Sequence, residues 1–146
     1  MINRGLIIKK KFDASHFINN YQGGCAKMHG HTYNVEFYFN FADRSLNELN
    51  MLFDFKKIDG LLNEIIGRYD HECINGIAPY GTYIGSGESI ESSFNTTNNP
   101  TAEYMAEVIY YAVNEYIVQE LSLPANPLKE IVIWETDKYA ATFGED

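Results

Sequence analysis

Alternation of apolar and polar residues predicts a β-strand over residues 29–41. Every second position carries the same character: His31, Tyr33, Val35, Phe37, Phe39 and Phe41. The residues between them are mostly polar, and a period of two is typical of a strand with one buried face. Residues 2–16 show a weaker form of this pattern, which Lys10 interrupts, and we predict a second strand there.

The middle of the chain changes to a helical period. One amphipathic helix is predicted from the spacing of Ile58, Leu61, Leu62, Ile65 and Ile66. A second helix is predicted to begin at Asn99 as N-cap, with Pro100 in its first turn. Its apolar face would consist of Ala102, Met105, Ile109, Val113 and Tyr116. Between the helices, residues 76–99 are rich in Gly, Ser, Thr and Asn, which predicts a long loop of a kind that is often functional.

Two further short strands are predicted near the end of the chain. They are the segments LKEIVIWET, residues 128–136, and YAATF, residues 139–143, joined by a tight turn. The order of elements is therefore strand, strand, helix, helix, strand, strand. We predict one α+β domain over residues 1–146, an antiparallel four-stranded sheet with both helices on one face.

Composition narrows the possible functions. The chain has 146 residues, of which 45% are hydrophobic, enough for a folded domain with a core. Its formal net charge of -9 disfavours a nucleic-acid-binding protein, which would present a basic surface. The apolar run Leu6–Ile8 is too short for a signal peptide or a membrane span, and two cysteines make no disulfide framework. We expect a soluble cytoplasmic protein with neither membrane nor nucleic acid as partner.

Two of the four histidines, His29 and His31, flank one glycine in the predicted strand 29–41. Residues i and i+2 of a strand point to the same face, about 7 Å apart, so both imidazoles can approach one metal ion. His16 ends the predicted strand 2–16, and pairing of the two strands would add a third imidazole. Three histidine nitrogens leave the fourth position of a tetrahedral zinc site open, as in catalytic zinc sites. Iron, nickel or copper would also accept these ligands, and the pair could simply be packed or solvated.

Other residues could supply acid–base or thiol chemistry. His71 follows Asp70, and a neighbouring carboxylate raises the proton affinity of an imidazole. The alternative is a solvated histidine at a helix end, where adjacent side chains diverge. Cys25 precedes His29 by four residues, and a nearby dication together with Lys27 would lower the pKa of its thiol. The alternative for this cysteine is a buried, inert thiol.

Six motifs occur in order across nearly the whole chain. They are FDASHF, CAKMHGHTYNVEF, FDFKKI, YDHECIN, NPTAE and IWETDKYAATF. Together they resemble the 6-pyruvoyltetrahydropterin synthase family, which includes the bacterial 6-carboxytetrahydropterin synthases of the queuosine pathway. The resemblance implies the T-fold, a β-β-α-α-β-β unit whose subunits assemble into barrels, commonly as homo-hexamers.

The resemblance also implies roles in catalysis. The zinc ligands that it implies are His16, His29 and His31. Cys25 resembles the catalytic thiol of the family. Asp70 and His71 resemble the pair that completes its proton relay, and in the family this pair comes from a neighbouring subunit, so that active sites lie at subunit interfaces.

Substrate contacts are implied for a further set of residues. Glu135 resembles the anchor of the pterin ring, since a carboxylate can accept two hydrogen bonds from the ring N3–H and the 2-amino group. Thr101 and Glu103 resemble additional pterin contacts. Lys27, between Cys25 and the HGH segment, is the best candidate to bind the triphosphate.

The resemblance finally implies a reaction. We expect zinc-dependent conversion of 7,8-dihydroneopterin triphosphate to 6-carboxy-5,6,7,8-tetrahydropterin, with release of acetaldehyde and triphosphate. The alternatives are a 6-pyruvoyltetrahydropterin synthase, which eliminates triphosphate, and a non-catalytic protein that binds zinc or pterin. No nicotinamide or flavin cofactor is expected.

Overall fold

The computed structural model describes residues 2–18, 21–76 and 99–145. Its helices and strands, in chain order, are β1 (Leu6–His16), β2 (His29–Phe39), α1 (Phe55–Ile66), β3 (Glu72–Cys73), α2 (Ala102–Leu121), β4 (Leu128–Trp134) and β5 (Ala140–Phe143). Most of the predicted loop 76–99 falls outside the described residues.

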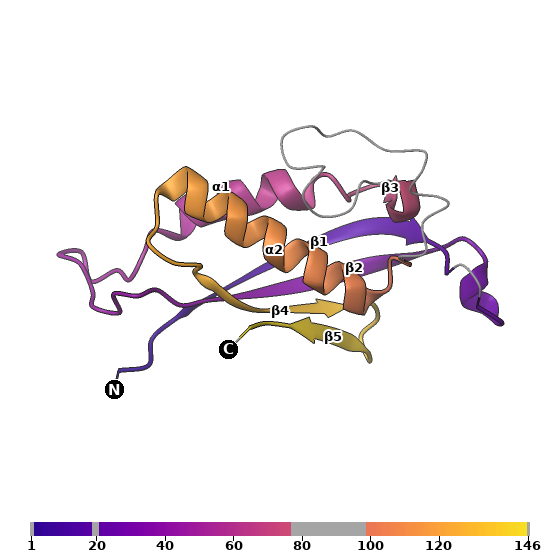
Figure 1. Cartoon of the computed structure of the whole chain (residues 1–146), viewed down its shortest axis with the longest axis horizontal. Coiled ribbons are helices and arrows are strands. Elements are labelled where there is room, and N and C mark those ends of the chain that lie inside the picture. Colours follow the sequence, from indigo (N-terminus) through magenta and orange to yellow (C-terminus); the bar gives the residue numbers. More distant parts are fainter. Residues whose placement is uncertain (1, 19–20, 77–98, 146) are drawn as a thin grey trace.

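The two long strands β1 and β2 form the centre of the sheet. They pair antiparallel along their whole length, from Leu6 opposite Phe39 at one end to His16 opposite His29 at the other. Strand β4 pairs with the other edge of β2, and β5 pairs with β4, both antiparallel. In the described part of the chain the strand order is β3-β1-β2-β4-β5 (Figure 1).

The predicted four-stranded antiparallel sheet is therefore wrong in one respect. A fifth strand, β3, runs parallel to β1, with Ala14 opposite Glu72 and Ser15 opposite Cys73. Two residues are too few to show any period in the sequence. Hydrogen bonding to an otherwise free edge of β1, rather than side-chain pattern, defines this strand.

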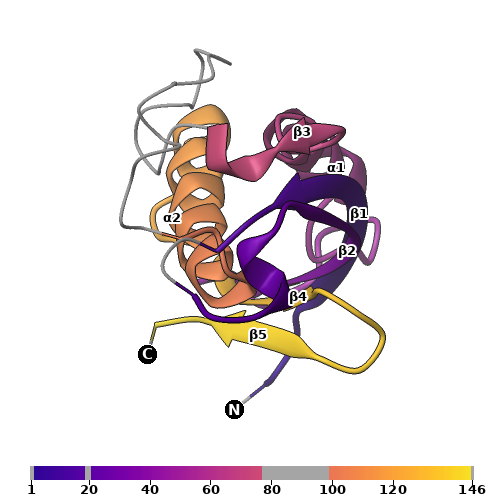
Figure 2. The same ribbon diagram turned by 90° about the vertical axis from the view of Figure 1, so that its right-hand side faces the viewer.

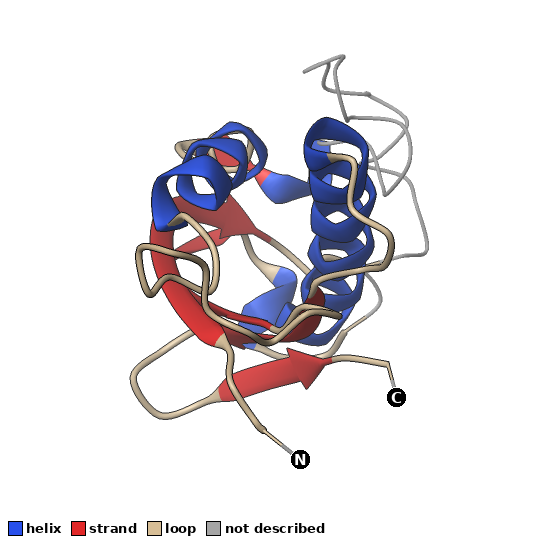
Figure 3. Ribbon diagram, turned by 90° about the vertical axis from the view of Figure 1, so that its left-hand side faces the viewer, coloured by secondary structure: helices blue, strands red, loops and turns tan. Residues whose placement is uncertain are grey.

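Both helices lie on the same face of the curved sheet (Figures 2 and 3). Helix α1 packs against β1 and α2, and α2 packs against β4 and β5. The buried side chains of the helix α1 are Ile58, Leu62, Ile65 and Ile66. On the sheet, alternate residues of β2 from Tyr33 to Phe39 are buried beneath the helices, as their period of two predicts.

Each helix begins at a side-chain cap. Asp54 accepts a hydrogen bond from the backbone N–H of Lys56 at the start of α1. At the start of α2, the hydroxyl oxygen of Thr101 accepts one from the N–H of Tyr104, at 3.1 Å. The predicted cap at Asn99 is wrong, because Thr101 already satisfies the first turn and Pro100 precedes the helix. Neither described helix is long and apolar enough to cross a membrane.

Candidate metal centre and active site

Three imidazoles converge at one end of the central strand pair. His16 is opposite His29 in the register of β1 and β2, and His31 is opposite Ala14, so all three side chains point to the helix-covered face. One nitrogen from each ring lies within 4.8 Å of one nitrogen from each of the others. We call His16, His29 and His31 the histidine cluster. The structure thus brings together the three predicted metal ligands, although their function as ligands stays a prediction.

Backbone carbonyls orient two of the three rings. The Nδ1–H of His16 donates to the carbonyl of Pro100 at 2.7 Å, and the Nδ1–H of His29 donates to the carbonyl of Lys27 at 2.7 Å. Because a carbonyl can only accept, these contacts place the proton on Nδ1 and leave a lone pair on each Nε2. The two Nε2 atoms lie 3.0 Å apart.

The ring of His31, the third of the histidine cluster, has a nitrogen that lacks a partner. Among the described residues, the Nε2 of His31 is a buried side-chain polar atom without a hydrogen-bond partner. Burial is also the main cause that lowers the pKa values of His16 and His31, which favours neutral imidazoles at neutral pH. A buried, unpaired nitrogen next to two lone pairs is unfavourable unless a cation binds there.

These residues fit a zinc ion. Zinc takes neutral imidazole nitrogens as ligands, and ligating histidines typically donate their second nitrogen to a backbone carbonyl, as His16 and His29 do. The donor set of three nitrogens also matches a site that keeps one position for a substrate or water. Through these hydrogen bonds, Pro100 just before α2 and Lys27 just before β2 orient two rings of the centre.

Glu135 follows the last residue of β4 and contacts the histidine cluster. Its Oε1 lies 3.4 Å from Nε2 of His16 and 3.5 Å from Nε2 of His31. The loop after β4 fixes its position, since the N–H of Glu135 donates to the carbonyl of Tyr139 at 3.1 Å. Thr136 supports the same loop by accepting hydrogen bonds from the N–H groups of Lys138 and Tyr139.

Sequence analysis missed one side chain of this centre. The hydroxyl of Tyr33 lies 3.3 Å from Nδ1 of His16, and its ring contacts that of His31. Burial is the main cause of the raised pKa of Tyr33, with the charge of Glu135 adding to it, so the hydroxyl keeps its proton. The alternating pattern predicts Tyr33 only as a residue on the buried face of the strand. Its position two residues after His31, on the same strand face, was the available signal.

Cys25 lies in a short turn beside the histidine cluster's end of the sheet. The turn is the 3-10 helix Gly24–Ala26, and the carbonyl of Cys25 accepts a hydrogen bond from the N–H of Ile18 at 2.8 Å. This bond ties the turn to the residues that follow His16. Cys25 is an exposed free thiol, so the alternative of a buried, inert cysteine is wrong.

Asp70 and His71 form a directly bonded pair within one chain. The Nδ1 of His71 lies 3.0 Å from Oδ2 of Asp70. The argument that adjacent helical side chains diverge does not apply here, because α1 ends at Ile66 and His71 has a φ of 63°. The N–H of Asp13 donates to Oδ1 of Asp70 at 3.0 Å and is the main cause that lowers the pKa of this carboxyl. The N–H of His71 donates in turn to the carbonyl of Asp13 at 2.6 Å.

This pair and the histidine cluster are separate groups in the described structure. The Asp70–His71 pair forms a group with Asp13, and we call these three residues the dyad cluster. Their ligand or proton-transfer atoms lie within 4.8 Å of one another. The side chain of Asp13 accepts a hydrogen bond from Thr32 on the sheet face opposite to that of His31. The side chains of Asp13 and His31 therefore lie on opposite faces of the strand pair, although both residues line one shallow hollow together with His71.

The remaining predicted substrate residues lie around the same end of the molecule. Thr101 and Glu103 are at the start of α2, where Thr101 caps the helix and Glu103 is exposed. Lys27 is exposed, and its carbonyl is the acceptor for His29. Their proposed contacts with a substrate stay predictions.

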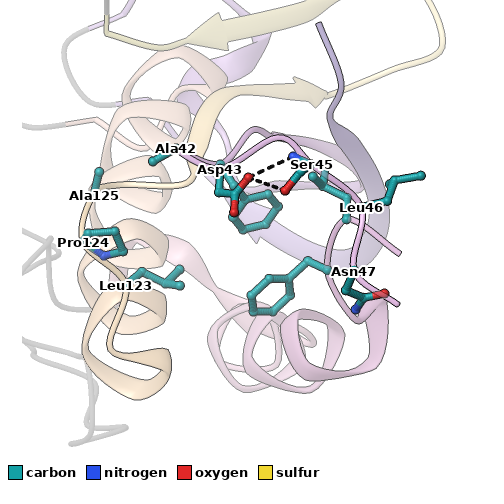
Figure 4. Close-up of a pocket in the computed structure, with 11 residues that line it drawn as sticks. Ala42, Asp43, Ser45, Leu46, Asn47, Leu123, Pro124 and Ala125 are labelled. Atoms are coloured by element: carbon teal, nitrogen blue, oxygen red, sulfur yellow. Dashed lines mark hydrogen bonds between the residues drawn. The ribbon is translucent and has the colours of Figure 1, made fainter. Parts of the chain in front are cut away.

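An apolar hollow, drawn in Figure 4, lies just beyond the end of the strand pair where Leu6 is opposite Phe39. It has a volume of about 340 Å³ and is lined by Phe41, Ala42, Asp43, Ser45, Leu46, Asn47, Leu52, Phe53, Leu123, Pro124 and Ala125. The carboxylate of Asp43 is occupied by the N–H and hydroxyl of Ser45, at 3.0 and 2.6 Å. We call this hollow the apolar pocket. It lacks the cluster of imidazoles and carboxylates found at the other end.

Relatives with known names point to one enzyme family. A protein of Pyrococcus horikoshii named putative 6-carboxy-5,6,7,8-tetrahydropterin synthase is 40% identical over 75 residues, which are 51% of this chain and 43% of that protein. The 6-carboxy-5,6,7,8-tetrahydropterin synthase of Rickettsia bellii is 34% identical over 99 residues, 66% of this chain and 70% of that protein. The match to the Pyrococcus protein thus takes in less than half of its length.

Solved structures share the fold. The 6-pyruvoyl tetrahydropterin synthase of Caenorhabditis elegans superposes with a TM-score of 0.71 at 16% identity, covering 98% of this chain and 96% of that one. The Plasmodium vivax 6-pyruvoyltetrahydropterin synthase gives a TM-score of 0.64 at 16% identity, with 98% of both chains covered. A family model described as 6-pyruvoyl tetrahydropterin synthase matches residues 6–146. The chain therefore belongs to the 6-pyruvoyl tetrahydropterin synthase family.

Proposed function

We propose that the chain is a zinc-dependent lyase that converts 7,8-dihydroneopterin triphosphate and one water molecule to 6-carboxy-5,6,7,8-tetrahydropterin, acetaldehyde and triphosphate, in queuosine or another 7-deazapurine pathway. The observation that carries the proposal is the convergence of the three imidazole nitrogens within 4.8 Å of one another. The names of the Pyrococcus and Rickettsia relatives support the 6-carboxy product. We propose further that residues 1–146 form one pterin synthase-like domain.

The histidine cluster would hold the metal ion. When bound, zinc would supply a Lewis acid that lowers the pKa of substrate hydroxyl groups. The hydrogen bonds to Pro100 and Lys27 would keep the rings of His16 and His29 in the tautomer needed for ligation. Cys25, exposed in a turn tied to the end of β1, would accept a proton from the substrate side chain as thiolate.

The dyad cluster would complete the proton relay. Asp70 orients His71 through one carboxylate oxygen while the N–H of Asp13 holds the other oxygen. Since Asp13 presents its side chain on the face opposite to that of His31, we propose that the pair serves the active site of a neighbouring subunit. A homo-hexamer with active sites between subunits would satisfy this requirement.

Substrate recognition would fall to residues around the histidine cluster. Glu135 would accept hydrogen bonds from the pterin ring, and its fixed loop supports this role. Thr101 and Glu103, at the N-terminal end of α2, would make further pterin contacts. Lys27 would bind the triphosphate, because it is exposed and its carbonyl accepts a hydrogen bond from His29.

A 6-pyruvoyltetrahydropterin synthase is the second candidate. The description of the matching family model and the names of the solved neighbours favour it. A non-catalytic protein that binds zinc or pterin is a third candidate, which would need the histidine cluster but neither Cys25 nor the dyad cluster.

The deciding experiment is incubation of the zinc-loaded protein with 7,8-dihydroneopterin triphosphate. Triphosphate, acetaldehyde and pterin products are then quantified in the same samples. We expect acetaldehyde and 6-carboxytetrahydropterin in equal amounts. Triphosphate with a pyruvoyl pterin and no acetaldehyde would support the second candidate, and no turnover by zinc-loaded protein would overturn both enzyme assignments.

The role of the thiol can be tested separately. The Cys25→Ala variant should lose turnover and keep a full complement of zinc, measured by elemental analysis. Cys73→Ala is the matched control, because this second thiol lies in β3 and has no proposed chemical role. Full turnover by Cys25→Ala would contradict the proposed mechanism.

A further inference from the structure

The carboxylate of Glu135 lies beside the histidine cluster, in which the Nε2 lone pairs of His16 and His29 already face each other. Its Oε1 is 3.4 Å from Nε2 of His16 and 3.5 Å from Nε2 of His31. The Nε2 of His16 carries a lone pair, because its Nδ1–H donates to the carbonyl of Pro100. A carboxylate cannot form a hydrogen bond with a nitrogen that has no proton. The contact with His16 is therefore repulsive unless a cation lies between the oxygen and this nitrogen.

Three of the six donor–donor distances that a four-ligand site would have match the edges of a tetrahedral metal site. With metal–nitrogen bonds of about 2.0–2.1 Å, neighbouring donor atoms of a tetrahedron lie about 3.3 Å apart. The two distances from Glu135 are close to this value, and the Nε2 atoms of His16 and His29 are 3.0 Å apart. A carboxylate oxygen is an acceptable fourth ligand for zinc beside imidazole nitrogens.

The position of the carboxylate is built into the fold. Glu135 follows Trp134, the last residue of β4, which pairs with Asn34 of β2. Continuing this antiparallel register places Glu135 next to Tyr33, on the same sheet face as the histidine cluster. The hydrogen bond from its N–H to the carbonyl of Tyr139 holds the backbone there. The side chain is 30% exposed, so it keeps access to a ligand from solvent.

We propose that Glu135 is a fourth ligand of the metal ion in the substrate-free protein, and that binding of a pterin ring removes this carboxylate from the ion. The first part concerns the chain and its metal alone. The second part rests on the proposed function, in which the same carboxylate accepts hydrogen bonds from the pterin. One carboxylate would then couple recognition of the ring to opening of a metal position for the substrate side chain. A diol without a pterin ring would not open that position.

The first part is tested without any substrate. Zinc affinity is measured by competition with a chromophoric chelator for the wild-type protein, Glu135→Gln and the control Asp137→Asn, an exposed carboxylate two residues further along the same loop. The visible absorption of the Co²⁺-substituted proteins reports the number and type of ligands. We expect Glu135→Gln to weaken zinc binding about tenfold or more and to change the Co²⁺ spectrum. Asp137→Asn should do neither. An affinity and a spectrum unchanged in Glu135→Gln would overturn the proposal.

The second part uses 7,8-dihydroneopterin, which carries the ring and side chain but no triphosphate. Its addition to Co²⁺-loaded wild-type protein should change the spectrum, while ethylene glycol, a diol without the ring, should not. Binding is followed in the same sample by pterin fluorescence. Bound pterin with an unchanged Co²⁺ spectrum would overturn the coupling. Failure of the proposed reaction is a separate result, because neither measurement requires turnover.

Discussion

The two ends of the central strand pair differ in the contacts that their side chains make. At one end, near Leu6 and Phe39, the sheet continues into the apolar pocket, where the rings of Phe41 and Phe53 stack with centroids 4.9 Å apart. At the other end the histidine cluster and Glu135 bring lone pairs and a negative charge together. The apolar end is satisfied by packing within the chain. At the imidazole end, the Nε2 of His31 has no hydrogen-bond partner among the described residues, so the donor atoms of this end would be satisfied by a bound ion.

The largest expected effect comes from removing an imidazole. His31→Ala should weaken zinc binding at least about 100-fold, because a ligand is lost from a three-nitrogen set. Turnover should fall below detection. The free energy of unfolding of the metal-free variant should fall by no more than about 2 kcal/mol, because the lost ring packs against Tyr33 but its Nε2 has no hydrogen-bond partner among the described residues.

Zinc titration and urea unfolding in the presence of a chelator measure these two quantities. His71→Ala is the control, because the dyad cluster is separate from the histidine cluster. Zinc bound with unchanged affinity by His31→Ala would contradict the assignment of this residue as a ligand.

A smaller loss of activity is expected from the dyad cluster. Asp70→Asn should lower kcat about 100- to 10,000-fold, the range typical of a misdirected general acid–base group. Zinc content should not change, because Asp70 bonds His71 and Asp13 rather than the metal ligands. Asp43→Asn, a carboxylate in the apolar pocket, should retain full turnover. Loss of zinc from Asp70→Asn would show that the two clusters act as one site within a chain.

A substitution at the apolar end should change the free energy of unfolding and leave zinc affinity unchanged. Phe53→Ala removes a partly buried ring that stacks on Phe41 with an interplanar angle of 7°. We expect the free energy of unfolding to fall by about 2–3 kcal/mol, somewhat below the usual range for a fully buried ring. Zinc affinity of the folded variant should equal that of the wild type. Urea unfolding of the metal-free protein and zinc titration check both statements, and an altered zinc affinity would show that the two ends are coupled.

The smallest effect is expected at Tyr33. Tyr33→Phe removes only the hydroxyl that lies 3.3 Å from Nδ1 of His16. Zinc affinity should fall by about tenfold at most, because the carbonyl of Pro100 still orients that ring. Tyr38→Phe, which loses a hydroxyl bonded to Glu36 on the other sheet face, should bind zinc like the wild type. Equal zinc affinity in both variants would show that the hydroxyl does not help to orient His16.

Local patterns predicted most of the fold. The alternation from His31 to Phe39 identifies β2 because one face of that strand is buried, and the spacing from Ile58 to Ile66 identifies α1 for the same reason. The two residues of β3 could not be predicted, since hydrogen bonds to a distant strand define them. The cap at Thr101 was missed because Asn99 and Thr101 are both good caps, and local sequence does not choose between them.

Some contacts of the candidate site could likewise be predicted from the sequence, and others could not. Three histidines on two adjacent strands could be placed together, because strand pairing and alternation determine which side chains share a face. The carbonyls of Pro100 and Lys27 could not, since every residue carries a carbonyl and only tertiary structure aims one at an imidazole. The contact of Glu135 with His16 depends on the register of β4 against β2, which the sequence does not reveal.

The positions of His16 and His29 have a consequence for how the ion and the fold depend on each other. These two residues bracket the segment 17–28, which carries Cys25. An ion that binds both imidazoles in the folded protein, and neither in the unfolded chain, would stabilise the fold by mass action. At a free-ion concentration 1,000-fold above Kd, this stabilisation is about 4 kcal/mol. Metal release would therefore lower the free energy of unfolding of the same fold that positions the thiol.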